Sequence, residues 1–558
     1  MTVGAIDYAV ISQSIVAAAR EMGAKLVRSA YSTVLREARD GSAAILDRNG
    51  GTVAQAELIP IQLGSIGLIY QACADVYPVD ELRPGDFYII NDPYSGGQHL
   101  QDVFIFHPIF FDDRVVGFSA SVAHHLDIGG GSPGLSVQAR DIHAEGLILP
   151  PLRFNMERDW KSGSFYRLLR ANVRIPHQTM GDFEAQMAAN EIGARRIQEL
   201  CAKYGAEAVE EVMAEFQNYS ERRTRAGIIA APDGVYHGED WVDDDGIGEQ
   251  PLAVKVKLTI DGDRIEVDFA GTSPQIATNL NSTWSATVSS ALCCIKSVLT
   301  SSDIPFNAGA ARPVTVTAPD GCILKPKYPA PVRARLEPCY RAYNAVMKAL
   351  SQAVPDKVIA CGFDTATIGC LSYLGPKGYS VYLEIFGGGF GAAEDADGCD
   401  AIDCPLSNCA NTPIEAIEQD FSFFRMHEYA IVPESYGHGA MRGGAGFRRS
   451  YRILKDGARV ALYGDRFRRG ALGLFGGQEG QPGSCRIFRD GEIIRLKSKD
   501  EAVLQEGDIV EFSMGGGAGY GAAEDRDPRL VAEDLADGLI SAETARRVYS
   551  RELEVEMA

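Results

Sequence analysis

The residues of this chain best suited to chemistry form two short motifs in its N-terminal part. The first is His99-Leu100-Gln101-Asp102, and the second is His124-His125-Leu126-Asp127. Imidazole nitrogens and carboxylate oxygens are the ligands that divalent transition metals take in proteins. Such a metal can lower the pKa of a bound water to about 7 and so supply hydroxide at neutral pH. The two motifs therefore predict a divalent metal site that activates water.

A predicted β-hairpin must bring these motifs together. Apolar runs at residues 103–111 and 115–123 are separated by Asp112-Asp113, a pattern typical of two antiparallel strands joined by a tight turn. If the turn centres on these aspartates, facing residue numbers sum to about 225, so we expect Asp102 opposite Ala123. His124, which follows Ala123 in the sequence, is then one residue away across the ladder. His99, on the loop that enters the first strand, can reach the same strand end.

One further residue completes the expected ligand set. Asp40 precedes a short apolar run of its own, and it is the expected additional ligand, which gives two histidines with one or two aspartates and room for water. His125 should turn to the opposite face, because neighbouring side chains along a strand alternate. The alternative is that these side chains only bond to nearby loop backbone and hold no metal.

Periodicity and turn residues predict an α+β fold of several domains, with antiparallel hairpins and a glycine-rich β C-terminal part. The expected helices include residues 182–204, 207–225 and 283–300 and two C-terminal helices opened by Pro528 and Ser541. We expect three domains: a metal-binding catalytic domain at 1–235, a middle α/β domain at 236–375, and a glycine-rich β domain with C-terminal helices at 376–558.

Composition excludes several classes of function. The net charge of −21 disfavours nucleic acid as a partner. We find no signal peptide and no apolar run of membrane-spanning length, so we expect a cytoplasmic protein that does not bind membranes. Cys399, Cys404 and Cys409 lack the usual zinc spacing and are interpreted as structural thiols. The glycine clusters at 129–131, 387–391 and 515–521 lack the Lys-Ser or Lys-Thr pair of a P-loop, so we predict tight backbone packing there and no nucleotide site.

Beyond these motifs, the sequence resembles the hydantoinase B/oxoprolinase family. The resemblance extends over nearly the whole chain. The blocks that carry it are Asn91-Asp92-Pro93-Tyr94 with Gly96-Gly97, His99 and Asp102; Ala123-His124 with Asp127-Ile128-Gly129-Gly130; Asn172-Val173-Arg174 with Gly181-Asp182; Asn307-Ala308-Gly309; Pro329-Ala330-Pro331-Val332; Asn411-Thr412-Pro413; Arg442-Gly443-Gly444; and Gly515 to Gly521 with Arg526-Asp527-Pro528.

The resemblance implies a partner and a reaction. Similar proteins pair a B-type chain with an A-type ATPase subunit, which binds ATP and phosphorylates the carbonyl oxygen of a small substrate. This chain would be the metal-binding subunit of an ATP-dependent lactam, 5-oxoproline or hydantoin hydrolase, in which metal-bound water opens the ring. His99, Asp102 and His124 match the metal-binding positions, with Asp40 as the additional ligand and zinc or manganese as the metal. Symmetry favours a heterotetramer of two A-type and two B-type chains.

Three interpretations stay open at the level of sequence. The first is the cyclic amide hydrolase, in which Asp102 or Asp40 orients water and Glu145 could transfer a proton. The second is a subunit of an ATP-dependent ketone carboxylase of the acetone or acetophenone type, which uses the same residue types. The third is a non-catalytic scaffold for the ATPase partner.

Overall fold

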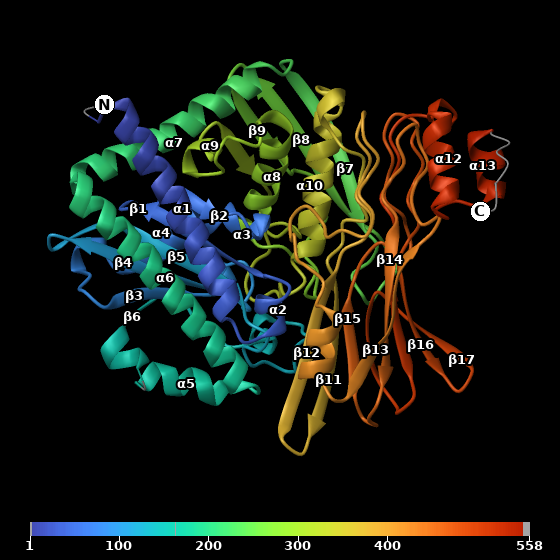
Figure 1. Cartoon of the computed structure of the whole chain (residues 1–558), viewed down its shortest axis with the longest axis horizontal. Helices are drawn as coiled ribbons and strands as arrows, with labels where there is room; N and C mark the ends of the chain where they lie inside the picture. The colour runs from blue at the N-terminus through green and yellow to red at the C-terminus, as the bar shows by residue number, and fades with distance from the viewer. Residues whose placement is uncertain (1–2, 162, 551–558) are drawn as a thin grey trace. The chain divides into compact units, whose positions relative to one another are not determined.

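The computed structural model describes residues 3–161 and 163–550, which form two compact units. The first unit comprises Met1–Glu239 and Val254–Val346, and the second comprises Asp240–Ala253 and Met347–Ala558. Helices and antiparallel sheets occur together in the chain (Figure 1), which confirms the α+β class and its several domains. The division into three domains stays a prediction. No helix in the described residues has the length and apolarity needed to cross a membrane.

The first unit is built around a six-stranded antiparallel sheet with the order β2-β1-β5-β4-β3-β6. Its strands are β1 (Gly41–Asp47), β2 (Thr52–Ala56), β3 (Asp86–Ile90), β4 (Asp102–Phe111), β5 (Arg114–His124) and β6 (Leu152–Asn155).

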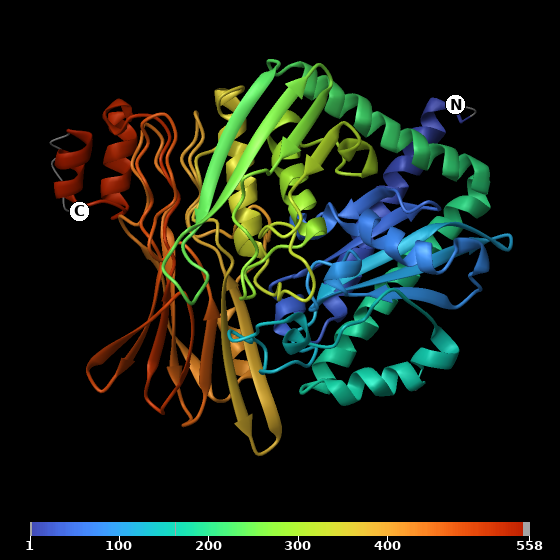
Figure 2. The same cartoon turned by 180° about the vertical axis from the view of Figure 1, so that it is seen from behind.

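Helices cover both faces of this sheet. Ala43 and Ile45 of β1 pack in the core formed with α1 (Ala5–Ser29), α6 (Pro176–Tyr204) and α7 (Ala206–Ile229). The intervening residues Ala44 and Leu46 pack on the other side, against α4 (Ile66–Val76). Figure 1 views the unit from the side of α1 and α6, and Figure 2 views it from behind. Because both faces are buried, the strands are continuously apolar and do not alternate with polar residues.

The β4–β5 hairpin exists as predicted, but the expected register was wrong by one residue. Near the turn Phe110 pairs with Val115, whereas Ile109 pairs with Gly117, so a bulge shifts the rest of the ladder. As a result Asp102 lies directly opposite His124, and not opposite Ala123. The bulge therefore brings two of the predicted ligands face to face.

A second, four-stranded sheet has the order β10-β9-β8-β7. Its strands are β7 (Gly234–Val242), β8 (Leu252–Asp261), β9 (Arg264–Asp268) and β10 (Val314–Thr317). The remaining helices of this part of the chain are α2 (Thr33–Arg36), α3 (Pro60–Leu63), α5 (Ser164–Asn172), α8 (Trp284–Leu299), α9 (Ala308–Ala311) and α10 (Leu336–Leu350). The expected helices at 182–204, 207–225 and 283–300 correspond to α6, α7 and α8.

The second unit contains two antiparallel sheets, β12-β11-β15-β18 and β13-β14-β19-β16-β17, that share an aromatic core. The rings of Phe386 and Phe512 stack in that core with centroids 4.7 Å apart. Its elements are β11 (Thr367–Gly375), β12 (Gly378–Phe386), α11 (Ile414–Asp420), β13 (Phe424–Val432), β14 (Gly446–Ile453), β15 (Arg459–Tyr463), β16 (Ser484–Arg489), β17 (Glu492–Leu496), β18 (Lys499–Val503), β19 (Ile509–Ser513), α12 (Pro528–Ala536) and α13 (Ala542–Tyr549).

The glycine clusters serve close packing of backbone on backbone, as predicted. Gly444 donates its N–H to the carbonyl of Phe390, and Gly517 donates to the carbonyl of Gly444. A Cβ on Gly389 would lie only 1.8 Å from the carbonyl oxygen of Gly444. No side chain fits between these segments, so close backbone packing is sufficient to explain the glycines.

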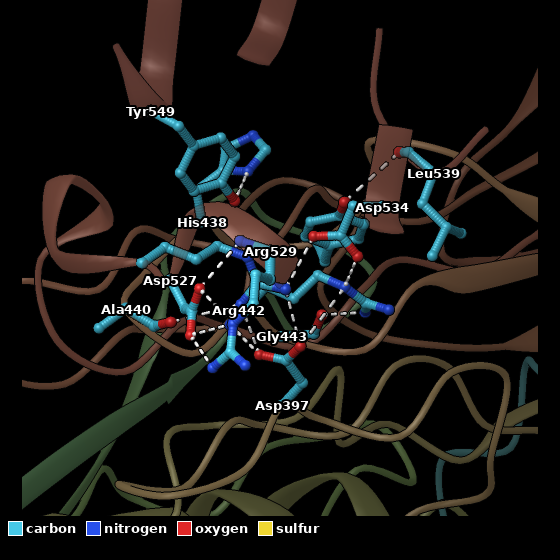
Figure 3. A network of polar contacts seen from close by, with 12 residues as sticks. Asp397, His438, Ala440, Arg442, Gly443, Asp527, Arg529, Asp534, Leu539 and Tyr549 are labelled. Carbon is cyan, nitrogen blue, oxygen red and sulfur yellow. Dashed lines mark hydrogen bonds and ion pairs between the residues drawn. The ribbon is translucent and has the colours of Figure 1, made fainter. Parts of the chain in front are cut away.

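Ion pairs attach α12 to these loops (Figure 3). Arg526 bridges Asp397 and Asp534, the latter on α12, and Arg442 pairs with Asp534 and Asp400. The predicted helix starts are confirmed, with Pro528 at the first position of α12 and the Ser541 side chain accepting the N–H of Thr544 before α13.

Candidate metal centre

Three neighbouring strands of the first sheet place four polar side chains at one end. Asp102 is the first residue of β4, and His124 is the last residue of β5. Asp40 immediately precedes β1, and its carbonyl accepts the N–H of His124 at 3.0 Å. His99 lies three residues before β4, in the loop that enters it. The structure thus brings together all four residues that the sequence predicted as ligands.

The distances between the donor atoms match those around a shared cation. His99 Nε2 lies 3.1 Å from Asp102 Oδ1. His124 Nδ1 lies 3.5 Å from Asp102 Oδ1 and 3.5 Å from Asp40 Oδ2. Ligand atoms bound at about 2.1 Å in tetrahedral geometry are about 3.4 Å apart. Within the described residues, His99, Asp102 and His124 form the one group of three such side chains with this convergence.

Several of these atoms are buried without a hydrogen-bond partner. They are His99 Nε2 and Asp102 Oδ1, and the outer ring nitrogens, His99 Nδ1 and His124 Nε2, also lack a partner. An unsatisfied buried polar atom costs about 1–3 kcal/mol, and folded proteins rarely tolerate several in one place. Two imidazoles and two carboxylates suit zinc or manganese. The residues present therefore fit a divalent metal.

The electrostatic environment favours the metal-binding protonation states of His99 and Asp102. Burial, assisted by Arg335, lowers the pKa of His99 to about 3, so its imidazole is neutral and has a free lone pair. Burial alone would raise the pKa of Asp102, but His99 and Arg335 outweigh it and hold that pKa well below its ordinary value. Burial raises the pKa of Asp40 to about 6, with His124 opposing and Asp102 reinforcing the shift.

Two long polar side chains hold the far oxygens of the carboxylates. Arg335 donates to Asp102 Oδ2 and also to Gln98 Oε1. Gln62, on α3, donates to Asp40 Oδ1 at 3.1 Å. These three residues were not predicted from the sequence. Arg335 stands 233 positions after Asp102, and its nearest sequence signal is the Pro329-Ala330-Pro331-Val332 block, which says nothing about an arginine three residues later.

His125 points away from the centre, as predicted. Its ring stacks on Phe183 with centroids 3.9 Å apart, and Nε2 lies 2.9 Å from Gln186 Oε1. Burial lowers the pKa of His125 to about 4. The residue belongs to the protein core.

Glu145 is buried but lies outside the group of donor atoms. Its two carboxylate oxygens accept the backbone N–H groups of Val332 and Arg333, at 3.0 and 2.9 Å. Burial raises its pKa to about 7, although both N–H donors oppose the shift. Such a pKa suits proton transfer, yet both oxygens are already engaged with backbone. A role in proton transfer stays a prediction.

The cysteines that recur every five residues give no metal site in the described chain. Cys404 and Cys409 are buried and Cys399 is exposed, and none of the three is in a disulfide. The Cys404 thiol donates to the carbonyl of Thr365 at 3.4 Å.

The fold and the site define a mixed α+β protein with a buried centre of histidine and aspartate ligands at one end of a six-stranded sheet. Its sequence matches the hydantoinase B/oxoprolinase family over residues 4–523. The chain therefore belongs to the hydantoinase B/oxoprolinase family.

Individual relatives agree with this assignment. A Pseudomonas sp. (strain NS671) chain, named as the B component of a putative D-/L-hydantoinase, is 34% identical over 98% of this chain and 94% of its own length. The crystal structure of the ATP-dependent caprolactamase from Pseudomonas jessenii superposes with a TM-score of 0.89 at 27% identity, covering 100% of this chain and 98% of that one. A nucleotide-free acetone carboxylase shares the fold, with a TM-score of 0.89 at 19% identity over 98% of this chain and 79% of that one.

Proposed function

We propose that this chain is the metal-binding subunit of an ATP-dependent cyclic amide hydrolase that opens a lactam, 5-oxoproline or hydantoin ring. The observation that carries the proposal is the buried convergence of His99, Asp102 and His124, with Asp40 beside them and with His99 Nε2 and Asp102 Oδ1 lacking a hydrogen-bond partner. The names of the relatives support the substrate class, because the hydantoinase and caprolactamase names denote enzymes that act on cyclic amides.

His99, His124, Asp102 and Asp40 would hold the metal, either zinc or manganese. When bound there, a divalent cation supplies a Lewis acid and lowers the pKa of water. The neutral imidazole of His99 and the ionised carboxylate of Asp102 are already in the forms that bind a cation. Asp40 or Asp102 would orient the attacking water, and Glu145, whose pKa burial raises to about 7, is our candidate for taking up its proton. Burial of the whole group excludes bulk water from the reacting atoms.

The proposal requires a partner subunit of the A type that binds ATP. An unactivated amide carbonyl is a poor electrophile, and transfer of the terminal phosphoryl group of ATP to its oxygen converts that oxygen into a leaving group. Water then adds to the carbon and gives up a proton, and the ring C–N bond breaks as the nitrogen takes up a proton, which leaves an acyl phosphate. A second water hydrolyses this acyl phosphate to the carboxylate and phosphate. The naming of one relative as a single component of a hydantoinase is consistent with such a partner. We place the complex in the cytoplasm, as a heterotetramer of two A-type and two B-type chains.

A ketone carboxylase of the acetone type is the second candidate, favoured by the shared fold. The measurement that separates the two is phosphate release by this chain copurified with its ATPase partner. Substrates would be 5-oxoproline, hydantoin, caprolactam and acetophenone, each with and without bicarbonate. We expect one cyclic amide to stimulate release regardless of bicarbonate. Stimulation by a ketone with carboxylated product only in bicarbonate would establish the carboxylase instead.

Two variants separate catalysis from a scaffold role. His99→Ala removes one predicted ligand and should abolish substrate-stimulated phosphate release while the complex still assembles. His125→Ala is the matched control, because it removes a buried histidine that faces the core, and it should keep turnover in a folded complex. If His99→Ala retained full turnover, the scaffold interpretation would replace ours.

A further inference from the structure

We propose that Arg335 is a positioning residue that restricts Asp102 to a single metal-binding oxygen, and that Gln62 restricts Asp40 in the same way. The proposal rests on the metal centre of the proposed function, and it concerns the residues behind the ligands. The segment that carries Arg335, although distant in sequence from the ligands, would then affect both the affinity and the geometry of metal binding.

The contacts of Arg335 divide the two oxygens of Asp102 between two tasks. Both side chains are almost fully buried. The guanidinium donates to Oδ2, while Oδ1 faces His99 Nε2 and His124 Nδ1 and has no hydrogen-bond partner. A charge-assisted hydrogen bond is about twice as strong as a neutral one, so Oδ2 is held firmly. Oδ1 is the oxygen left for a cation.

Gln62 repeats this arrangement at the other carboxylate. Its amide nitrogen donates to Asp40 Oδ1, whereas Asp40 Oδ2 lies 3.5 Å from His124 Nδ1. Gln98 connects Arg335 with the segment of Gln62. Its side-chain oxygen accepts from Arg335, and its side-chain nitrogen donates to the carbonyl of Ile61, next to Gln62. Each aspartate thus presents one oxygen to the centre and has the other engaged by a neighbouring side chain.

The segment that carries Arg335 is itself fixed from several sides. Glu145 accepts the N–H groups of Val332 and Arg333. The N–H of Ala334 donates to the carbonyl of Asn279 at 2.9 Å. The guanidinium therefore starts from a rigid backbone, which is what a residue that orients a ligand requires. This gives Glu145 a positioning role through Arg335.

Charge gives Arg335 a second effect on the same centre. Asp40 and Asp102 bring two carboxylates into one buried place, and Arg335 is the cation that contacts one of them directly. Without it, Asp102 gains a free second oxygen and loses a partner. Its carboxylate could then rotate or bind through both oxygens, so both the affinity and the geometry of the centre should change.

The test measures metal binding by the full-length chain without any turnover assay. Metal-free wild type, Arg335→Met and Arg335→Lys would be titrated with Mn²⁺ against a fluorescent chelator, and the visible absorption of their Co²⁺ forms would be recorded. We expect Arg335→Met to weaken Mn²⁺ binding about 10- to 100-fold, as loss of a residue behind a ligand does, and to change the Co²⁺ spectrum. Arg335→Lys keeps the charge, so its Mn²⁺ affinity should lie between those of wild type and Arg335→Met.

Arg333→Met is the matched control, because Arg333 is equally buried two residues earlier and its side chain donates to the carbonyl of Gly134. It should bind Mn²⁺ within about 3-fold of wild type, a change smaller than the roughly 10- to 100-fold loss expected when a residue behind a ligand is removed. Arg335→Met with wild-type affinity and a wild-type Co²⁺ spectrum would overturn the proposal. If Arg335→Met does not fold, wild-type values in Arg335→Lys have the same meaning, because lysine cannot reproduce the fork that reaches Asp102 and Gln98 together. If wild type binds no more metal than His99→Ala, the metal centre of the proposed function fails instead.

Discussion

Asp102→Asn is the substitution that examines the centre most directly. The amide has nearly the shape of the carboxylate but carries one oxygen and no charge. In the native chain Oδ1 faces the two imidazoles and Oδ2 accepts from Arg335. The amide oxygen can take only one of these places. Its NH2 group must then face either the incoming cation or the guanidinium, and both arrangements are repulsive.

Two losses of free energy follow. Removing one partner of a buried ion pair typically destabilises a protein by about 3–5 kcal/mol, because the other charge is left buried. Separately, a metal present at about 1,000 times its Kd stabilises the folded state by about 4 kcal/mol. Since Asp102→Asn removes an anionic ligand, most of this second stabilisation should disappear. The variant is therefore expected to have a lower Tm and, more diagnostically, a Tm that barely responds to metal.

Calorimetry of metal-free protein, with and without saturating Mn²⁺ or Zn²⁺, measures both effects. Asp127→Asn is the matched control, because Asp127 is also buried and its Oδ1 lies 3.3 Å from Arg174 Nη1. It should lose stability as well, yet keep the full rise in Tm on metal addition. An Asp102→Asn variant with the same metal-induced rise as wild type would refute the assignment of Asp102 as a ligand.

Three further predictions concern the surroundings of the centre. Because the pKa of Glu145 is raised to about 7, its stabilising contribution is complete below the ordinary pKa of about 4.5 and is lost as the pH rises through about 7. The opening free energy from amide exchange at Val332 and Arg333 should fall by up to about 1.4 kcal/mol per pH unit in that window, and Glu145→Gln should flatten this dependence. His125→Leu loses the contact with Gln186 and should lower stability by about 1–3 kcal/mol, with metal content by elemental analysis unchanged. Gly443→Ala would place a Cβ 2.0 Å from the carbonyl oxygen of Gly517 and should cost about 1–3 kcal/mol or more, seen as a lower Tm of the second unit.

The local parts of the structure could be predicted from the sequence because they depend on short-range patterns. The β4–β5 hairpin follows from two apolar runs and a pair of aspartates, whose φ angles of +47° and +60° suit a tight hairpin turn. The bulge opposite Ile109 and Phe110, in which Val116 of β5 is the extra residue, could not be predicted, since nothing in the two apolar runs marks where an extra residue sits. The four ligands were predictable because three of them border the two strands of one hairpin.

The side chains behind the ligands follow from tertiary packing, which no local pattern encodes. Gln62 comes from α3 and Arg335 from the loop before α10, and neither is near His99 or His124 in sequence. A buried glutamine or arginine looks in sequence like any polar residue of a loop. Its partner becomes visible only when the segments are placed in space.

The positions of the donor atoms point to a centre that forms before the metal arrives. Asp102, His124 and Asp40 lie at the ends of β4, β5 and β1. The backbone pairing of these three adjacent strands fixes the backbone position of each ligand. In small zinc domains, by contrast, the ligands come together only on binding, so the binding free energy is the folding free energy. Here the sheet is held by cores on both faces, independently of the centre. Removal of a ligand such as His99 should therefore abolish metal binding and leave the fold intact, and for this reason ligand variants can separate a catalytic role from a structural one.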